Sequence, residues 1–368
     1  MNNHISGINI KSFRGIKNLE LKDTKLINIL TGDNNGGKTS VLEVIRSVED
    51  PGNLKTWKEL IRKNNSVSVD KGITYYEGFY DLFDINEEKK RIEYDVCLSD
   101  QKRHKVRLTA EESEEEITAK EFMKIQGLAV TEEEAVHDNF LNISKLTLKT
   151  VLDEKEIMKD FLYDAQFRYQ PEYKNMDRIL AGDIIYISPV RHAEGDVYLS
   201  KILDYPDMYE QMLQVLKEYD EDIISINYDS NEKRFGKGNY KILSKSNKKA
   251  LPLNVYGDGM KKAILLMSAV IAAKDGILLL DEFETAIHTS AMSKTFKWIV
   301  ESCKRLNVQV FMTSHSKEAI DKLLKCSSDC LNEIAVYTLY KDSEGTSVRR
   351  LEGKKAIEAQ DEMGLELR

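Results

Sequence analysis

The decapeptide TGDNNGGKTS at residues 31–40 has the spacing of a phosphate-binding loop: a glycine, four residues, then Gly-Lys-Thr. The apolar run at 26–30 (LINIL) predicts a buried strand before it, and SVLEVIRSV at 40–48 predicts a helix after it. Together they predict an anion site, because free backbone N–H groups converge at such a helix start. There Lys38 would contact β- and γ-phosphate oxygens and the Thr39 hydroxyl would face Mg²⁺. The alternative is a glycine-rich turn without a ligand.

The composition sets limits on the class of protein. The chain has 368 residues, with 54 Lys and Arg against 62 Asp and Glu, a formal net charge of −8. This length can bury a core without disulfides or metals. The acidic balance argues against a nucleic-acid surface over the whole chain, but it leaves a local basic patch open. Four lysines predict either a solvated loop or a phosphate-backbone contact: Lys241, Lys245, Lys248 and Lys249.

Cysteine spacing and hydropathy indicate the compartment. Cys97, Cys303, Cys326 and Cys330 form no Cys-x-x-Cys pair, and no histidine lies near the last two, which favours free thiols over zinc. No apolar run approaches the length of a membrane span, and no secretory signal begins the chain. We therefore expect a soluble, cytoplasmic protein with no membrane partner.

The middle of the chain has a different character. RIEYDVCL at 91–98 alternates between apolar and polar residues and predicts a strand, as do 105–108 and 142–150. The acidic run 111–116 predicts a solvated face or loop edge, and a partner-docking surface is the alternative. DIIYIS at 183–188 then predicts a central strand of the main sheet. We interpret the chain as three parts: 1–72, an inserted α+β region at 73–182, and 183–368.

Two acids come directly after another apolar run. ILLL at 277–280 predicts a buried parallel strand that brings Asp281 and Glu282 to the carboxyl edge of a sheet, where ligands bind. Asp281 would hold Mg²⁺ and Glu282 would polarise the attacking water; capping of the next helix is the alternative. NVQVFMT at 307–313 predicts a second strand that brings His315 to the same edge. His315 would contact the γ-phosphate or the water, unless it is an ordinary core or surface histidine.

These motifs occur in a recognisable order. Along the chain stand FRG at 13–15, the phosphate loop, GDG at 257–259, LLLDEFETAIH at 278–288 and TSHS at 313–316. This order resembles the ABC-type ATPases of the SMC, RecF and OLD (overcoming lysogenization defect) group, most of all the short AAA-type ATPases related to OLD proteins. The resemblance covers residues 1–50 and 183–325. It implies an α/β fold, an ABC-type P-loop NTPase head with a mixed central sheet, plus the inserted α+β region.

The resemblance also assigns roles and implies ATP and Mg²⁺ as ligands. Residues 32–40 match the Walker A loop, 281–282 match Walker B with the general base, 284–288 match the D-loop, and His315 matches the switch histidine. Metal binding is then expected from Thr39 and Asp281, and catalysis from Glu282 and His315. Nucleotide contacts are expected from Gly32, Asn34, Asn35, Gly36, Gly37, Lys38, Thr39, Ser40, Arg14, Gly257, Gly259 and Lys261.

Two departures from the family pattern affect the expected hydrolysis rate more than nucleotide binding. The signature serine is absent, because Tyr256 or Gly257 stands in its place, so its hydroxyl bond to the γ-phosphate is lost or replaced. Lys261, at the helix start, would have to compensate for that bond. No glutamine occurs between residues 40 and 100, so a Q-loop glutamine is not identifiable there.

The resemblance implies a shared site. In this architecture the signature of one subunit covers the phosphate loop of another. One chain here supplies one of each, so a complete site needs two copies, head to tail, with two ATP molecules between them. The number of copies beyond two stays open.

The segment after His315 decides whether we expect an effector domain in this chain or a separate effector protein. OLD-type proteins often carry a TOPRIM nuclease after the ATPase, but only 53 residues remain after His315 here, and 334–340 and 348–351 predict edge strands. We expect an ATPase that senses or gates a separate effector protein, a nuclease, as similar proteins do in bacterial antiphage systems. The alternatives are a RecF/SMC-like DNA-binding repair ATPase and a scaffold that barely hydrolyses ATP.

Overall fold

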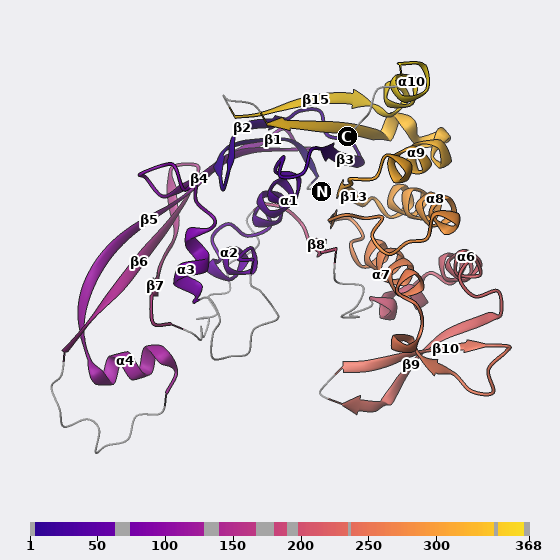
Figure 1. Cartoon of the computed structure of the whole chain (residues 1–368), viewed down its shortest axis with the longest axis horizontal. Coiled ribbons are helices and arrows are strands. Elements are labelled where there is room, and N and C mark those ends of the chain that lie inside the picture. The colour runs from indigo at the N-terminus through magenta and orange to yellow at the C-terminus, as the bar shows by residue number, and fades with distance from the viewer. Residues whose placement is uncertain are drawn as a thin grey trace.

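The computed structural model of the chain describes residues 4–62, 74–128, 140–166, 180–189, 198–234, 237–341 and 345–363. The predicted domain boundary at residues 72 and 73 lies outside these ranges. The described residues form a parallel-rich sheet, a long antiparallel sheet and a small third sheet, with helices between and around them (Figure 1).

The parallel-rich sheet has the strand order β15-β14-β3-β13-β12-β8. Its strands are β3 (Ile27–Gly32), β8 (Ile184–Ile187), β12 (Ile277–Leu280), β13 (Gln309–Thr313), β14 (Ile334–Lys341) and β15 (Thr346–Glu352). Only β15 runs antiparallel to its neighbour, so the sheet is mixed and the predicted α/β fold class is confirmed.

Two strand positions differ from the expectation. β8 joins the main sheet as predicted, but it lies at the edge beside β12 and not at the centre. β14 was expected at an edge, yet it pairs with β3 on one side and with β15 on the other. All but the last two of its residues are buried, which explains why an interior place suits it.

The antiparallel sheet has the order β2-β1-β4-β5-β6-β7. Its strands are β1 (Ile5–Phe13), β2 (Ile16–Leu21), β4 (Arg91–Leu98), β5 (Arg103–Thr118), β6 (Phe140–Leu152) and β7 (Lys155–Tyr163). The strands predicted in the middle of the chain therefore continue a sheet that the first residues begin. The acidic run 111–116 lies inside β5 and not in a loop, and the long strands β5 to β7 project away from the parallel-rich sheet (Figure 1).

Helices cover both faces of the parallel-rich sheet. Alternate residues of β12 show the division: Leu278 and Leu280 pack with α7 (Asp258–Ala272), α8 (Thr289–Leu306) and α9 (Lys317–Cys326). Ile277 and Leu279 belong to the opposite core, with α1 (Lys38–Ser47) and the antiparallel sheet. The remaining helices and third sheet are α2 (Leu54–Glu59), α3 (Tyr75–Tyr80), α4 (Ala119–Gln126), α6 (Pro206–Leu216), α10 (Gly353–Met363), β9 (Ile223–Arg234), β10 (Lys237–Ser244) and β11 (Leu251–Pro252).

Two simpler expectations concern cysteines and membranes. Cys97, Cys303, Cys326 and Cys330 form no disulfide with one another. Within the described ranges, no helix combines the length and the apolar character that a membrane crossing requires.

A buried carboxylate links three strands of the antiparallel sheet. Glu93 in β4 is 6% exposed and pairs with Lys11 of β1 at 3.2 Å, Lys105 of β5 at 3.3 Å and Arg107 of β5 at 3.2 Å. Burial alone would raise the pKa of Glu93, but hydrogen bonds from Arg107, Lys11 and Lys105 outweigh it and lower that pKa to about 2.

The pKa of Glu93 is lower in the folded chain than in the unfolded chain, so its ionised form stabilises the fold. This stabilisation is complete above the ordinary carboxyl pKa of 4.5 and is lost as pH falls towards 2. We expect Glu93→Gln to lower the free energy of unfolding by about 2 kcal/mol at neutral pH, after allowing for solvent screening of its partly exposed partners. The difference should shrink in urea unfolding at about pH 3. Glu20→Gln, at an exposed ion pair on β2, is the matched control. If the difference in unfolding free energy between wild type and Glu93→Gln were the same at pH 3 as at neutral pH, the lowered pKa of Glu93 would be contradicted.

Candidate functional site

The predicted phosphate loop joins β3 to α1, as the sequence indicates. Its backbone requires glycine at both ends: Gly32 has φ 123° and Gly37 has φ 91°. A Cβ at Gly32 would lie 2.2 Å from Leu339 O of β14, so a larger residue would separate the two strands. The loop therefore leaves the sheet at its carboxyl edge with the first N–H groups of α1 free of helical partners.

Lys38 lies at the first position of α1 and is 4% exposed. Its Nζ donates to Gly32 O at 2.8 Å and to Asp33 O at 2.7 Å. Burial lowers the pKa of Lys38, and the negative charges of Asp33 and Asp281 oppose that shift. The ammonium group thus lies within the loop. There, charged phosphate oxygens can take the place of the two neutral carbonyl oxygens as its hydrogen-bond acceptors.

Asp281 comes directly after β12 and is 3% exposed. Its carboxylate accepts hydrogen bonds from Thr39 Oγ1 at 3.0 Å, Thr313 Oγ1 at 2.5 Å and Tyr186 Oη at 3.2 Å. These donors come from α1, β13 and β8, so three neighbouring elements converge on one carboxylate. The sequence predicted that Thr39 and Asp281 would both hold Mg²⁺, but it gave no indication of Tyr186, because the place of Tyr186 depends on β8 lying beside β12.

The oxygens around Asp281 suit a hard divalent cation. A carboxylate and a threonine hydroxyl are ligands that Mg²⁺ accepts, with water completing its shell. Burial and the charge of Asp281 raise the pKa of Tyr186, so its hydroxyl stays protonated and acts as a donor to Asp281. No cluster of three or more His, Cys, Asp or Glu side chains that could hold a metal occurs in the described part of the chain.

Glu282 and His315 lie together at the same edge of the sheet. Glu282 has a left-handed backbone with φ 46°, and its N–H donates to Thr313 Oγ1 at 2.8 Å. His315 Nε2 lies 3.9 Å from Glu282 Oε1. Their side chains are 42% and 38% exposed, so both can reach a bound ligand.

Two adjoining cavities connect the predicted residues. One, of about 510 Å³, is lined by Asn34, Asn35, Glu282, Glu284 and His315. The other, of about 190 Å³, is lined by Asn35, Gly36, Gly37, Lys38, Thr39, Ser40, Arg62 and His315. Since Asn35 and His315 line both, the phosphate loop and the residues after β12 and β13 face one continuous space.

A second arginine joins Arg14, the one that the sequence suggested, around Glu43 of α1. The Arg14 Nε lies 3.0 Å from Glu43 and an Arg14 guanidinium nitrogen donates to Leu60 O at 2.8 Å, and Arg14 lines neither cavity. Arg62 lines the loop cavity, pairs with Glu43 at 3.0 Å and donates to Ser40 Oγ at 3.3 Å. Arg62 comes after α2 without any local motif, so nothing in the sequence marked it.

The residues expected to replace the signature lie apart from the loop of their own chain. Gly257, Gly259 and Lys261 stand at the start of α7 and line neither cavity. A Cβ at Gly257 would meet nothing within 4 Å, and the Lys261 ammonium pairs with Asp258 at 2.7 Å. Gly259 packs closely on the next motif, because a Cβ there would lie 2.9 Å from Ala286 O.

Glu284 organises the turn that carries His315. Its Oε1 accepts hydrogen bonds from Ser314 Oγ at 2.8 Å, His315 N at 3.1 Å and Ser316 N at 3.2 Å. The neighbouring Phe283 is 1% exposed and packs edge-to-face on Phe296 of α8, with ring centroids 4.9 Å apart. Glu284 therefore holds the 314–316 turn, which carries His315, through three hydrogen bonds to one oxygen.

Comparison with known proteins places this geometry in a family. A model described as "AAA domain, putative AbiEii toxin, Type IV TA system" matches residues 27–321, which include both halves of the site. The chain belongs to this AAA family. An "ATP/GTP phosphatase" of Helicobacter pylori is 26% identical over 376 residues, covering 92% of this chain and 93% of that protein.

Further matches agree with an ABC-type ATPase. The DNA replication and repair protein RecF of Nitrosococcus oceani is 50% identical over 42 residues, 11% of this chain and 12% of that protein. An SMC head solved with the C-terminal winged-helix domain of ScpA superposes with a TM-score of 0.51 at 10% identity, covering 96% of this chain and 99% of that chain. The AAA-family chain thus has the fold of an SMC head, which is that of an ABC-type P-loop NTPase head.

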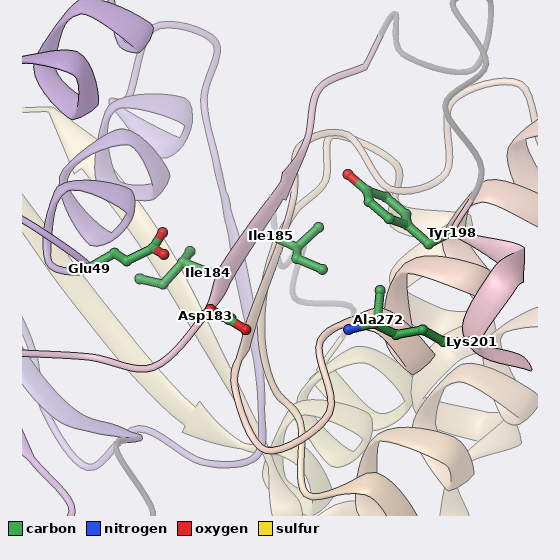
Figure 2. Close-up of a pocket in the computed structure, with 7 residues that line it drawn as sticks. All are labelled: Glu49, Asp183, Ile184, Ile185, Tyr198, Lys201 and Ala272. Carbon is green, nitrogen blue, oxygen red and sulfur yellow. The ribbon is translucent and has the colours of Figure 1, made fainter. Parts of the chain in front are cut away.

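One other cavity of this AAA-family chain lies away from the motifs. It measures about 270 Å³ and is lined by Glu49, Asp183, Ile184, Ile185, Tyr198, Lys201 and Ala272. Figure 2 shows it around the start of β8, with Glu49 and Ile184 on one side of the strand and Ile185 and Tyr198 on the other. Because the site residues lie at the opposite, carboxyl end of β8 and β12, this cavity is separate from the phosphate loop.

Proposed function

We propose that this chain hydrolyses ATP with Mg²⁺ at a site shared by two copies, as the regulatory ATPase of an antiphage system with a separate effector nuclease. The observation that carries the ATPase part is the direct contact between Thr39 and Asp281 at 3.0 Å, beside the cavity that Glu282 and His315 line. Phosphate binding, metal binding and water activation can therefore occur in one space.

Each residue has a role that its position supports. Lys38 would exchange its carbonyl acceptors for β- and γ-phosphate oxygens, while Thr39 and Asp281 would hold Mg²⁺, which neutralises charge on the phosphates when bound. Glu282 would orient a water molecule and accept its proton as the water oxygen bonds to the γ-phosphorus and the bond to the ADP oxygen breaks. His315 would donate a hydrogen bond to the γ-phosphate.

The case for a second copy rests on the open side of the site. Glu282 and His315, with side chains 42% and 38% exposed, line the larger cavity, whereas Gly257 and Lys261 line neither cavity at the loop of their own chain. A head-to-tail pair would bring the open turn at Gly257 over the partner's nucleotide. This supports two ATP molecules per dimer and leaves a higher oligomer open.

Mixing two defective variants tests the shared site. Lys38→Met removes phosphate binding, and Gly257→Arg places a bulky group on the open turn; each variant alone should release little phosphate from ATP. In an equimolar mixture, a heterodimer has one site built from an intact loop and an intact turn, so activity should reappear. If the mixture stays as inactive as its components while each variant remains folded by circular dichroism, the shared site is wrong.

The partnership with an effector rests on the family description, which names a toxin and a toxin–antitoxin system and so favours action with a second protein. The test uses the ATP-locked Glu282→Gln variant as bait in the native host, with Lys38→Met as the matched control. We expect nuclease activity to be enriched only with the ATP-locked bait. Equal recovery of nuclease activity with both baits would contradict ATP-gated partnership.

A RecF/SMC-like DNA-binding ATPase is the second candidate, supported by the RecF match and by the exposed side chains of Lys245, Lys248 and Lys249 beside β10. Such a protein would bind duplex DNA more tightly with ATP, and the affinity would fall steeply with salt. Fluorescence anisotropy with labelled duplex separates the candidates, because the effector-gating function predicts no ATP-dependent gain in affinity.

A further inference from the structure

The core of α7 contains a lysine that the proposed mechanism does not use. Lys262 is 0% exposed, and its Nζ has no hydrogen-bond partner among the residues that the structure describes. It lies one residue after Lys261, among the apolar side chains that pack α7 against the sheet and α8. Burying an ammonium group without partners is costly, so a compensating charge or a function is needed to explain it.

The compensating charge comes from the site. Burial lowers the pKa of Lys262 to about 8, and the carboxylates of Glu284, Asp281 and Glu282 oppose that shift, with Glu284 first. Lys262 thus lies inside the field of the three acids that come after β12, and among the described residues none of their oxygens comes within 4.0 Å of its Nζ to form an ion pair.

Glu284, the carboxylate with the largest effect on the pKa of Lys262, has one oxygen that accepts no hydrogen bond from the described residues. Glu284 Oε1 accepts three hydrogen bonds from the 314–316 turn, whereas Glu284 Oε2 is buried and accepts none from the described residues. A buried, unpaired carboxylate oxygen is stabilised by a nearby positive charge. The first turn of α7 also touches this loop, since the space at Gly259 is closed by Ala286 O.

We propose that Lys262 is a positioning residue: its buried charge holds Glu284, and through Glu284 it orients the turn that presents His315. The inference rests on the proposed ATPase site. It adds a link from Lys262 in α7, through Glu284, to the turn that carries His315. The signature turn of α7 faces the partner's nucleotide in the proposed dimer. Lys262 would therefore make the His315 of one site responsive to the nucleotide in the other.

The energetic consequence separates positioning from structural support. Replacing a buried charge with a well-packed apolar side chain of similar volume is often neutral or stabilising. Lys262→Met should therefore keep or raise the melting temperature, while kcat for ATP hydrolysis falls on the order of 10-fold to 100-fold from misplacement of His315. The KM for ATP should change by less than about twofold, because Lys38 and the loop are untouched.

The experiment compares Lys262→Met with Lys58→Met, a matched control at a buried lysine of α2 that stacks on Tyr75 away from the site. We expect lowered kcat with an unchanged or higher melting temperature for Lys262→Met only. In a double-mutant cycle, adding Lys262→Met to Glu284→Gln should cause no further loss, because Lys262 acts only through the charge of Glu284. A lower melting temperature with unchanged kcat, or additive losses in the cycle, would overturn the proposal.

A second readout does not depend on hydrolysis. The N–H groups of His315 and Ser316 donate to Glu284, so their hydrogen exchange reports how firmly the turn is held. We expect faster exchange in the 314–317 segment of Lys262→Met and no change in Lys58→Met. If the wild-type chain released no phosphate, the proposed function would fail while this measurement still decided the role of Lys262; equal exchange in both variants would refute that role.

Discussion

Lys38→Met is expected to weaken ATP binding on the order of 100-fold, about 3 kcal/mol, with little change in fold stability. The loss is large because the Lys38 ammonium already lies within the phosphate loop and donates to two of its carbonyls. Charge-assisted hydrogen bonds to phosphate exceed those to carbonyls, and the variant loses both charge and donors. Isothermal titration calorimetry with ATP and Mg²⁺ measures the change.

A matched control separates this effect from loss of a surface lysine. Lys55 in α2 forms an exposed pair with Glu59, so Lys55→Met should bind ATP like the wild-type chain. The fold should tolerate Lys38→Met, because burial already disfavours the charged form of Lys38. Wild-type affinity in Lys38→Met would mean that the loop is a turn without a phosphate ligand.

Glu282→Gln is expected to reduce steady-state phosphate release by about 1000-fold while ATP binding persists. Glutamine has the size and hydrogen-bonding shape of glutamate but cannot accept the proton of the attacking water. Glu282 also has a left-handed backbone held by Thr313, so the substitution leaves that turn in place. ATP should then stay bound between two copies, and the mass in solution should double on ATP addition.

Light scattering with and without ATP provides the measurement. Glu301→Gln, at an exposed i,i+4 pair on α8, is the control that should hydrolyse ATP normally. A Glu282→Gln chain that is as monomeric with ATP as without it would refute the ATP-driven dimer. Normal phosphate release in the variant would instead assign water activation to another residue, such as His315, whose Nε2 lies 3.9 Å from Glu282 Oε1.

Local patterns carried most of the prediction. The run 26–30 and the decapeptide after it correctly predicted β3, the loop and α1, because both the burial of a strand and the glycine backbone are short-range properties. The same holds for β12 and β13, whose buried runs brought the residues after them to one edge. The predicted positions of β8 and β14 in the sheet were wrong, since hydropathy reflects burial but not which strand lies on each side.

The sequence by itself determined the fold class and the residues that a P-loop site would use: a phosphate loop, two acids and a histidine, each at the end of a buried strand, predict an ABC-type NTPase core. Only the tertiary structure decided which further side chains act on them. Tyr186 and Arg62 reach the site through strand neighbours and packing that bring together residues far apart in the chain, and the role inferred for Lys262 depends on helix packing in the same way. Their roles depend on burial and charge in three dimensions, and no short-range pattern contains those.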